Sequence, residues 1–567
     1  EPNAQTGAVI AVDVKTGDVL SMASYPTFDP NKFVTGLSDE DYKALKPSNA
    51  NDVLAPSAEI NLATQGVFQP GSAFKMITGM AALEKGMDPN YTIQDPGVIM
   101  LGNRPFADYI WHKGRGNHGA TNLYKAIQES CNVYFYTLGS GTNFTGGEDP
   151  NPKIGIEDIF NTSKLFGLDE KTGLYDEIYE RNGRVPSIDD KKNGMKALLR
   201  SYIDKTMAND FEGITRENNK EEYDEKIDTI VSWVDEEEIP TRGEVIKRLE
   251  KLGVKEDRVE KIADSILFDY LKFSKWSTAD AFNISIGQGE NQATPAQIVR
   301  YISAIANGGN LVELSTVDRV ISSDYSSLYI DENQINKIKF NNLENLKILK
   351  DAMELVVTQG SAKKAFANFP IKVAAKTGTA DKSGKIPTDN EVNYLETHIQ
   401  DFGVSLEEAR DLAAKLKKEK EEELKKEREE EIKKSLNDNS LSKEEKESLE
   451  KELKEGVQVK LEDNDKVNSS YLRKAIKELN PNLTDEKIDQ YKSDYRSFSW
   501  SVAFAPSDNP EIAVAVVIPQ GGSSGNAMLM VREVMGAYFE PEKINTTDSS
   551  IGISNEDSIN FVSSMKK

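Results

Sequence analysis

A serine and a lysine three residues apart, Ser72 and Lys75, are the first candidates for nucleophilic chemistry, in the stretch GVFQPGSAFKMITGM. A Pro-Gly pair precedes them and an apolar helical run follows. Residues i and i+3 of a helix share one face. Burial disfavours the ammonium form and lowers the pKa of a lysine. A neutral Lys75 could therefore take the proton of the Ser72 hydroxyl, while the helix N-terminus offers N–H groups to an oxyanion.

The Ser-x-x-Lys pattern alone is common and does not identify a catalytic site. Three further copies lie in polar helix or tail sequence, at Ser440/Lys443, Ser448/Lys451 and Ser563/Lys566. Only the copy at Ser72 follows Pro-Gly and begins an apolar helix. We therefore interpret Ser72 and Lys75 as the reactive pair.

Two further motifs place polar side chains inside apolar sequence, where such groups are otherwise unwelcome. Ser130 and Asn132 lie in AIQESCNVYFYTLG, between two apolar helical runs. The second motif is Lys-Thr-Gly-Thr at 376–379, at the end of the buried strand VAAKTGTA. Lys-Thr-Gly also occurs at 15–17 and 171–173, in a hairpin turn and a loop. On the strand, Gly378 would let a substrate backbone approach closely.

The three motifs, in the order Ser-x-x-Lys, Ser-x-Asn, Lys-Thr-Gly, form the active-site set of penicillin-binding proteins and serine β-lactamases. The chain resembles the transpeptidase domain of a class B penicillin-binding protein. Other stretches agree, among them GQGENQATPAQIVRYISAIANGG and WSVAFAPSDNPEIAVAVVIPQGG. The segments YPTFDPN and DPGVIMLGNRPFADYIWHKGRGNHG look most like the cell-elongation subgroup. The two helical insertions depart from the usual family pattern.

The resemblance implies a role for each catalytic residue. Ser72 would be the acylated nucleophile and Lys75 its base. Ser130 would relay a proton to the leaving amine, and Asn132 would orient the substrate amide and Lys75. Lys376 would add positive charge and a hydrogen bond to Ser130, and would depress the pKa of Lys75.

The resemblance also implies how substrate is held. Thr377 and Thr379 would bind the terminal carboxylate of D-Ala-D-Ala or of a β-lactam, with Gly378 between them. The N–H groups of Ser72 and Thr379 would form the oxyanion hole. The expected reaction is acyl transfer from a peptidoglycan stem peptide, with release of D-alanine, to an amine on a neighbouring strand.

Three alternatives from other functional classes remain. A serine β-lactamase of the same fold would need a group that activates water for deacylation, and the sequence identifies none. A β-lactam-binding sensor would be acylated without cross-linking. An inert scaffold of the elongation or division machinery would use the helical insertions to bind partners, and the intact triple motif argues against it.

A structural zinc site beside the active site is a further expectation. Cys131, the only cysteine, lies inside the Ser-x-Asn motif, with Asp95, His112 and His118 upstream of it. Thiolate, imidazole and carboxylate are usual zinc ligands, and four protein ligands make a closed structural site. Some elongation-type penicillin-binding proteins hold zinc through a loop of this kind. We expect these four ligands, with Asp108 in reserve, although a lone cysteine is most often a small buried residue.

The composition excludes some partners. The 567 residues carry a formal net charge of -24, whereas nucleic-acid binding requires a basic surface.

No run reaches the roughly 18 to 20 apolar residues of a membrane span, and no signal peptide precedes the first strand. By resemblance, the domain would act at the extracytoplasmic face of the bacterial cytoplasmic membrane, anchored by an N-terminal segment outside this sequence. Its partners would be a lipid II polymerase and cell-shape proteins.

The elements that must position these residues predict an α/β (α+β) protein of the penicillin-binding-protein and serine β-lactamase type. We expect an antiparallel sheet flanked by helices, in which the strand 371–380 and the hairpin 499–519 are neighbours.

Charged amphipathic segments predict two helical insertions. In the first, Thr241 and Glu244 are expected to form a capping box. In the second, a highly charged helical hairpin at 405–456, with a capping box at Ser442 and Glu445, is expected to project into water. The expected boundaries are transpeptidase parts at 1–186, 276–384 and 496–540, insertions at 187–275 and 385–495, and a disordered tail at 541–567.

Overall fold

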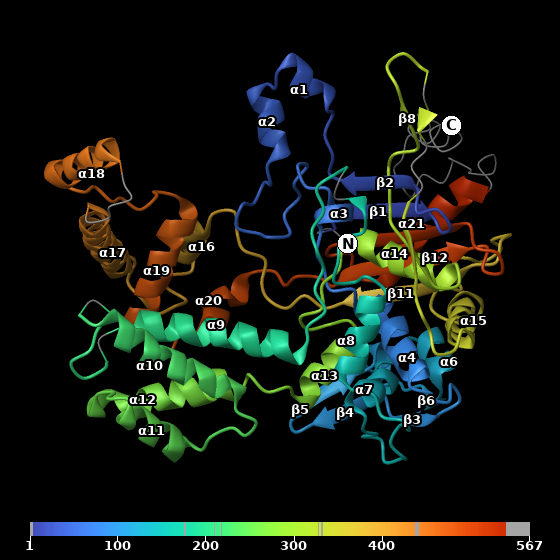
Figure 1. The fold of residues 1–567 in the computed structure, drawn as a ribbon, viewed down its shortest axis with the longest axis horizontal. Coiled ribbons are helices and arrows are strands. Elements are labelled where there is room, and N and C mark those ends of the chain that lie inside the picture. Colours follow the sequence, from blue (N-terminus) through green and yellow to red (C-terminus); the bar gives the residue numbers. More distant parts are fainter. Residues whose placement is uncertain are drawn as a thin grey trace. The chain divides into compact units, whose positions relative to one another are not determined.

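The computed structural model describes residues 4–174, 177–208, 210–216, 218–326, 328–329, 333–436 and 442–539. The chain divides into two compact units (Figure 1). Unit 1 takes the described residues of 1–27, 60–381 and 496–567, and unit 2 takes 28–59 and 382–495. The tail predicted at 541–567 lies outside the described residues. Among the described residues, no helix combines the length and apolar content that crossing a bilayer requires.

Unit 1 is built on a five-stranded antiparallel sheet with the strand order β11-β12-β13-β1-β2. The strands are β1 (Gly7–Asp13), β2 (Val19–Tyr25), β11 (Ala374–Ala380), β12 (Phe498–Ala505) and β13 (Ile512–Ile518). The expected pairing of the Lys-Thr-Gly strand with the later hairpin is confirmed, with Lys376 opposite Val502. Because β11 is an edge strand, its outer edge is not paired within the sheet.

Every residue of β12 and β13 is buried, so both faces of the sheet are covered along these two strands. The helices α14 (Pro295–Ala306) and α21 (Ser524–Phe539) both pack on these two strands. Next to them, α15 (Glu344–Thr358) contacts β11 and also α4 (Lys75–Glu84). The almost uniformly apolar sequences of α4 and α14 fit this burial, since both helices lie inside the unit.

The remaining elements of unit 1 are short. The 3-10 turn η1 spans Gly71–Phe74. Four two-stranded ribbons pair β3 with β6, β4 with β5, β7 with β10 and β8 with β9. These strands are Ile93–Asp95 (β3), Val98–Leu101 (β4), Arg104–Ala107 (β5), Gly119–Thr121 (β6), Asn310–Val312 (β7), Val320–Ile321 (β8), Leu328–Tyr329 (β9) and Ile335–Lys337 (β10). The helices are α3 (Leu62–Gln65), α5 (Tyr109–Gly114), α6 (Leu123–Gln128), α7 (Asn132–Ser140), α8 (Ile156–Leu165) and α13 (Thr278–Ser285).

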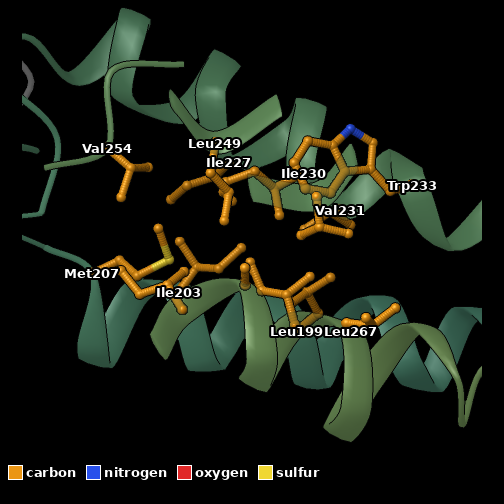
Figure 2. Close-up of a cluster of buried hydrophobic side chains, with 14 of the residues drawn as sticks. Leu199, Ile203, Met207, Ile227, Ile230, Val231, Trp233, Leu249, Val254 and Leu267 are labelled. Carbon is orange, nitrogen blue, oxygen red and sulfur yellow. The ribbon is translucent and has the colours of Figure 1, made fainter. Parts of the chain in front are cut away.

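The first predicted insertion, 187–275, is helical and has a core of its own (Figure 2). Its elements are α9 (Ile188–Thr206), α10 (Lys220–Ser232), η3 (Trp233–Asp235), α11 (Arg242–Lys251), α12 (Glu256–Ser265) and η4 (Ile266–Leu271). Apolar side chains from each of these helices, among them Leu199, Ile230 and Leu249, meet in one buried cluster. The capping box predicted at Thr241 and Glu244 opens α11.

Unit 2 differs from the prediction at one boundary. The sequence assigned 28–59 to the transpeptidase part, but the structure groups this segment with 382–495. The side-chain amide of Asn49 donates to Pro387 O at 2.7 Å, and the Tyr495 hydroxyl donates to Asp52 Oδ1 at 2.6 Å. Such contacts join segments more than 300 residues apart, so the spacing of residues could not reveal them.

Unit 2 is helical, and some of its helices enclose a small apolar core. The helices of the unit are α1 (Asn31–Thr35), α2 (Asp39–Leu45), α16 (Glu391–Thr397), α17 (Leu406–Leu436), α18 (Lys443–Glu455), α19 (Asp465–Leu479), α20 (Asp485–Ile488) and η5 (Asp489–Tyr491). Those that enclose the core are α16, α17, α19 and α20. Ala409 of α17 lies in this core with Leu472 and Ile476 of α19. The helical hairpin predicted at 405–456 is therefore only partly a projection into water, because the first turns of α17 pack on α19.

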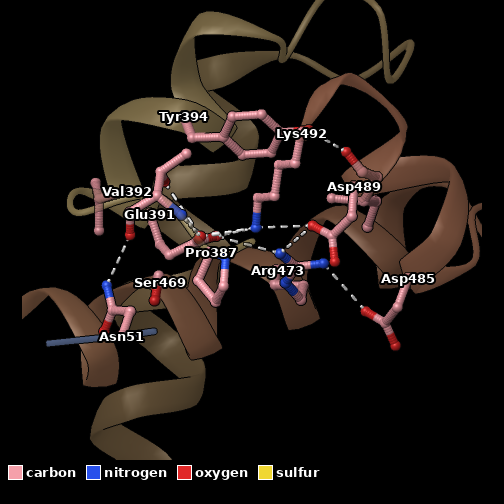
Figure 3. Close-up of polar contacts among 12 residues, drawn as sticks. Asn51, Pro387, Glu391, Val392, Tyr394, Ser469, Arg473, Asp485, Asp489 and Lys492 are labelled. Atoms are coloured by element: carbon pink, nitrogen blue, oxygen red, sulfur yellow. Dashed lines mark hydrogen bonds and ion pairs between the residues drawn. The ribbon is translucent and has the colours of Figure 1, made fainter. Parts of the chain in front are cut away.

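A cluster of charged side chains joins α16, α19 and η5 of unit 2 (Figure 3). Lys492 Nζ lies 2.7 Å from both carboxylate oxygens of Glu391 and 2.9 Å from Asp489 Oδ1. Arg473 donates to the same Asp489 oxygen at 2.7 Å. Buried charges are tolerated when they are paired in this way, and the cluster holds together segments at the two ends of the insertion.

Candidate active site

The nucleophile candidate Ser72 lies in η1, which runs directly into α4. In a 3-10 turn, side chains at i and i+3 eclipse, so Ser72 and Lys75 stand on one face, as the sequence predicted. Ser72 is half-buried, whereas Lys75 is fully buried. Gly71 has φ +54°, and a Cβ there would meet Thr379 O at 2.5 Å. The absence of a side chain thus lets the nucleophile turn lie against the edge strand β11.

Lys75 is held by the Ser-x-Asn motif. Its Nζ donates to the backbone carbonyl of Ser130 and to Asn132 Oδ1, both at 2.7 Å, and lies 3.3 Å from Ser130 Oγ. Burial lowers the pKa of Lys75 to about 8, although Asp108 and Cys131 partly offset this effect. The amine is therefore positioned by acceptors and titrates near neutral pH, as a general base requires.

Lys376 approaches the same serine from the sheet. Its Nζ donates to Ser130 Oγ and to the backbone carbonyl of Thr377, both at 2.8 Å. Burial, together with the neighbouring charge of Lys75, lowers the pKa of Lys376 well below its usual range. Ser130 Oγ thus lies between two lysine amines, which suits a group that passes a proton between a base and a leaving group.

The backbone around Ser130 is unusual. Ser130 has φ 60°, a left-handed conformation that is uncommon outside glycine. It directly precedes the N-cap of α7, Cys131, whose Sγ accepts from Tyr134 N at 3.4 Å. Asn132 is fixed at both ends of its amide, because Nδ2 donates to Ala107 O at 2.9 Å while Oδ1 accepts from Lys75. The motif is therefore rigid on both sides of Cys131.

The strand β11 carries the expected substrate-binding residues, with one correction. Thr377 is only 4% exposed, and Thr379 is half-buried. A Cβ on Gly378 would meet Trp500 Cβ at 3.0 Å, Ala73 N at 3.1 Å and Pro70 O at 3.2 Å. Gly378 therefore makes room for the nucleophile turn of the protein itself. This packing does not agree with the prediction that Gly378 makes room for a substrate backbone.

Four potential metal ligands gather beside the Ser-x-Asn motif. Ligand atoms of Asp95, Asp108, His118 and Cys131 all lie within 4.8 Å of one another. His118 Nδ1 is 2.8 Å from Asp95 Oδ2 and 3.4 Å from Asp108 Oδ2, and Cys131 Sγ is 3.6 Å from Asp108 Oδ2. The structure does not bring His112 into this group, because α5 turns its side chain outward to solvent. Asp108, which the sequence held in reserve, takes the fourth place.

The electrostatics of this cluster suit a bound cation. Burial disfavours the imidazolium of His118, but hydrogen bonds with Asp108 and Asp95 outweigh it and raise its pKa to about 9. Burial raises the pKa of Asp108 and of the Cys131 thiol. Two carboxylates and a thiol packed together favour a positive partner, and the donor set of one thiol, one imidazole and two carboxylates matches zinc.

The cluster is directly coupled to the catalytic motif. Asp108 precedes α5 but does not cap it with its side chain. Its Oδ1 instead accepts from the backbone N–H of Asn132, while Oδ2 faces Cys131 and His118. One carboxylate therefore joins the candidate metal ligands to the residue that orients Lys75.

Three supporting residues were not predicted from the sequence. The Tyr301 hydroxyl donates to Ala73 O and supports the nucleophile turn from α14. Gly287 has φ +73°, and its backbone carbonyl accepts from Gly71 N at 2.9 Å. Ser361 Oγ lies 2.6 Å from Thr377 Oγ1. Of these, Gly287 and Tyr301 had a sequence signal, since both lie in the stretch GQGENQATPAQIVRYISAIANGG, whereas Ser361 had none.

Comparisons with known proteins identify the family to which the chain belongs. A family model described as "Penicillin binding protein transpeptidase domain" matches residues 7–200 and 262–402, and the gap falls within the first insertion. The peptidoglycan D,D-transpeptidase MrdA of Haemophilus influenzae is 25% identical over 94% of this chain and 53% of its own length. The enzyme of that name from Acinetobacter baumannii is 26% identical over 66% of this chain and 41% of its own length. The chain thus spans about half the length of the curated relatives it matches.

A solved structure shares the fold. The crystal structure of Pseudomonas aeruginosa PBP2 in complex with WCK 5153 superposes with a TM-score of 0.51 at 21% identity. The match covers 96% of this chain and 76% of that chain. It confirms the predicted fold class, an antiparallel sheet flanked by helices.

Proposed function

Because the chain belongs to the penicillin-binding protein transpeptidase family, we propose that it is a class B peptidoglycan D,D-transpeptidase that works through a serine acyl-enzyme. The observation that carries the proposal is the environment of Lys75. Its buried amine is held by Ser130 O and Asn132 Oδ1, three residues along one face from Ser72. The relatives named above carry this activity in their names.

The acylation step follows from these contacts. Neutral Lys75 takes the proton of Ser72 as Oγ attacks the carbonyl carbon of the penultimate D-alanine of the stem peptide. The oxyanion is stabilised by the backbone N–H groups of Ser72 and Thr379. Ser130, between Lys75 and Lys376, passes a proton to the nitrogen of the leaving D-alanine, so the C–N bond breaks as an amine departs. A β-lactam follows the same path but keeps its leaving group attached.

The second half of the reaction reverses these roles. An amine from a neighbouring stem peptide attacks the ester carbonyl on Ser72, and Lys75 or Ser130 accepts its proton. The proton returns to Ser72 Oγ as the ester bond breaks. The buried position of Lys75 favours this exchange, because its pKa of about 8 lets it move between charged and neutral forms near neutral pH. Burial lowers the pKa of Lys376 as well, which eases the release of a proton from its amine.

The acyl donor is bound along β11. Thr377 and Thr379 would hold the terminal carboxylate, and Lys376 supplies a nearby amine. The outer edge of β11 is open in the sheet order, so an extended peptide can add to it by main-chain hydrogen bonds. Stem peptides ending in D-Ala-D-Ala combine the extended backbone and terminal carboxylate that this arrangement recognises.

We further propose a structural zinc ion held by Asp95, Asp108, His118 and Cys131. These side chains fit the ion by their chemistry and by their separations within 4.8 Å. When bound, the metal would supply a fixed cross-link with no redox or Lewis-acid role. The residues themselves then hold the N-terminus of α7 in place, because Cys131 caps it and Asp108 accepts from Asn132 N.

At the scale of the cell, the names of the relatives and the motifs of the elongation subgroup support a role in wall growth. The chain would act at the extracytoplasmic face of the cytoplasmic membrane through a membrane anchor outside this sequence. Its partners would be a lipid II polymerase and cell-shape proteins. In one solved structure, Helicobacter pylori PBP2 forms a complex with MreC, which supports a partner of that kind here.

A cross-linking assay tests the proposed reaction. The protein is incubated with a stem pentapeptide ending in D-Ala-D-Ala and a soluble amine acceptor, and products are identified by mass spectrometry. The proposal predicts D-alanine release together with a peptide–amine product. Acylation by penicillin without any such product would favour the sensor, and rapid penicillin hydrolysis would favour the β-lactamase.

A further inference from the structure

The turn that follows α15 lies between the two halves of the active site. A Cβ on Gly360 would meet Gln128 O at 2.3 Å. The backbone of this turn is therefore pressed against the end of α6, two residues before Ser130. On the other side, the next residue, Ser361, reaches the strand β11.

The contact to β11 is a pair of hydroxyl groups. Ser361 Oγ lies 2.6 Å from Thr377 Oγ1, and either atom can be the donor. Thr377 is only 4% exposed, whereas Ser361 is exposed. The backbone carbonyl of Thr377 accepts from Lys376, which also donates to Ser130. Ser361 is thus the outermost member of a chain of polar groups that ends at the proton relay.

The direction of the hydrogen bond between Ser361 and Thr377 decides whether the Thr377 hydroxyl hydrogen is available to a ligand. A hydroxyl has one hydrogen to donate and two lone pairs to accept with. If Thr377 donates to Ser361, it has no hydrogen left for a ligand. If Ser361 donates to Thr377, the hydrogen of Thr377 remains free, and a carboxylate accepting it gains a charge-assisted hydrogen bond.

We propose that Ser361 is a positioning residue for recognition of the acyl donor's carboxylate. Its hydroxyl donates to Thr377 and leaves the Thr377 hydrogen for the terminal carboxylate of the stem peptide or β-lactam. The inference rests on the proposed function and adds to it a residue outside the three motifs. Since Ser361 is exposed and acts through Thr377, its removal affects carboxylate-bearing ligands selectively and leaves the fold intact.

The test compares two acyl donors that differ in one group, benzylpenicillin and its methyl ester. Ser361→Ala is expected to lower the second-order acylation rate constant for benzylpenicillin by about fivefold, because Thr377 keeps its hydrogen but loses the one neutral hydrogen bond that orients it. The rate constant for the ester should stay within about twofold, and the melting temperature should not change. Ser361→Thr restores the hydroxyl and should restore the benzylpenicillin rate.

Thr358→Ala provides a matched control. Thr358 is an exposed hydroxyl at the end of the same helix, and it donates only to Glu354 O within α15 at 3.1 Å. Its loss should leave both rates unchanged.

Equal losses for both donors in Ser361→Ala, or no loss for either, would overturn the inference while leaving the proposed function in place. A wild-type protein that neither donor acylates would instead overturn the proposed function, and this inference with it.

Discussion

At the scale of single residues, the site depends on lysines placed where they cannot be fully hydrated. Lys75 and Lys376 are both fully buried, and neither is neutralised by a carboxylate in direct contact among the described residues. Their acceptors are backbone carbonyls, hydroxyls and an amide. This arrangement lowers both pKa values and converts groups that are usually charged into proton acceptors.

The pH dependence of acylation follows from the pKa of about 8 for Lys75. Because the neutral amine is the base, the rate should rise with pH up to about 8 and level off above it. Stopped-flow measurements with a chromogenic β-lactam between pH 6 and 9.5 would record this profile. A rate that falls as pH rises through 8 would show that the charged amine is required.

The candidate zinc site can be tested at Cys131. Serine is as good an N-cap as cysteine, so Cys131→Ser keeps the bond to Tyr134 N but removes the thiolate ligand. If zinc is held there, the variant should lose the metal, melt at a lower temperature and acylate more slowly. Elemental analysis of protein purified without chelator measures the metal directly.

The opposite results would refute the metal site. In that case the wild-type protein holds substoichiometric zinc, and Cys131→Ser changes neither the zinc content nor the melting temperature. His112→Ala is the matched control, since this histidine is exposed and lies outside the cluster. Its loss should change neither the zinc content nor the melting temperature.

The candidate catalytic residues could be grouped from the sequence because short motifs fix residues that stay close along the chain. Ser72 and Lys75 share one helical face, and Ser130 and Asn132 flank one helix start. The predictions for the metal ligands and for Gly378 were wrong in part because tertiary contacts decide the placement of these residues. The orientation of α5 excludes His112 and admits Asp108, four residues earlier. The space at Gly378 is filled by the turn around Ala73, which lies about 300 positions away in the chain.

At the scale of elements, the charged hairpin shows what periodicity can and cannot predict. The helices and the capping box at Ser442 and Glu445 agree with the sequence. A charged surface suggested that the entire hairpin was surrounded by water. Instead, α17 places Ala409 in the core of unit 2, and few apolar positions were enough to pack one face of its first turns on α19.

A deletion in this region separates the turns of α17 that reach the core of unit 2 from the segment 422–460, whose buried Ile432 and Val457 lie outside that core. Glu421 Oε1 accepts from Leu461 N at 2.9 Å, so the chain ends on either side of 422–460 lie close together. A short Gly/Ser linker in place of 422–460 should leave both melting temperature and acylation rate within severalfold of the parent, since closing a short loop costs little and the site lies in unit 1.

Replacing 405–456 is the contrasting variant. It removes Ala409 and exposes Leu472 and Ile476, at a cost of about 1.5–3 kcal/mol for each large side chain. This variant should therefore lose stability in unit 2, detectable by hydrogen exchange in α19. Equal stability of the two deletion variants would show that α17 does not support this core.

At the scale of the whole molecule, the chain places its candidate active-site residues on segments that are far apart in sequence. Lys376 meets Ser130 across 246 positions. The sequence predicted the central sheet and two helical insertions, because strand and helix patterns are local. It did not predict that 28–59 joins the second insertion, since that grouping rests on scattered side-chain contacts such as Asn51 with Asp465.

The most direct test of the account is the intact mass of the protein after incubation with benzylpenicillin. We expect one covalent adduct, mapped by peptide analysis to Ser72, and no adduct in Ser72→Ala. Ser448→Ala, at another Ser-x-x-Lys copy on an exposed helix, is the control and should be acylated like the parent. An adduct that persists in Ser72→Ala, or that maps to Ser440, Ser448 or Ser563, would contradict the assignment of Ser72 as the nucleophile.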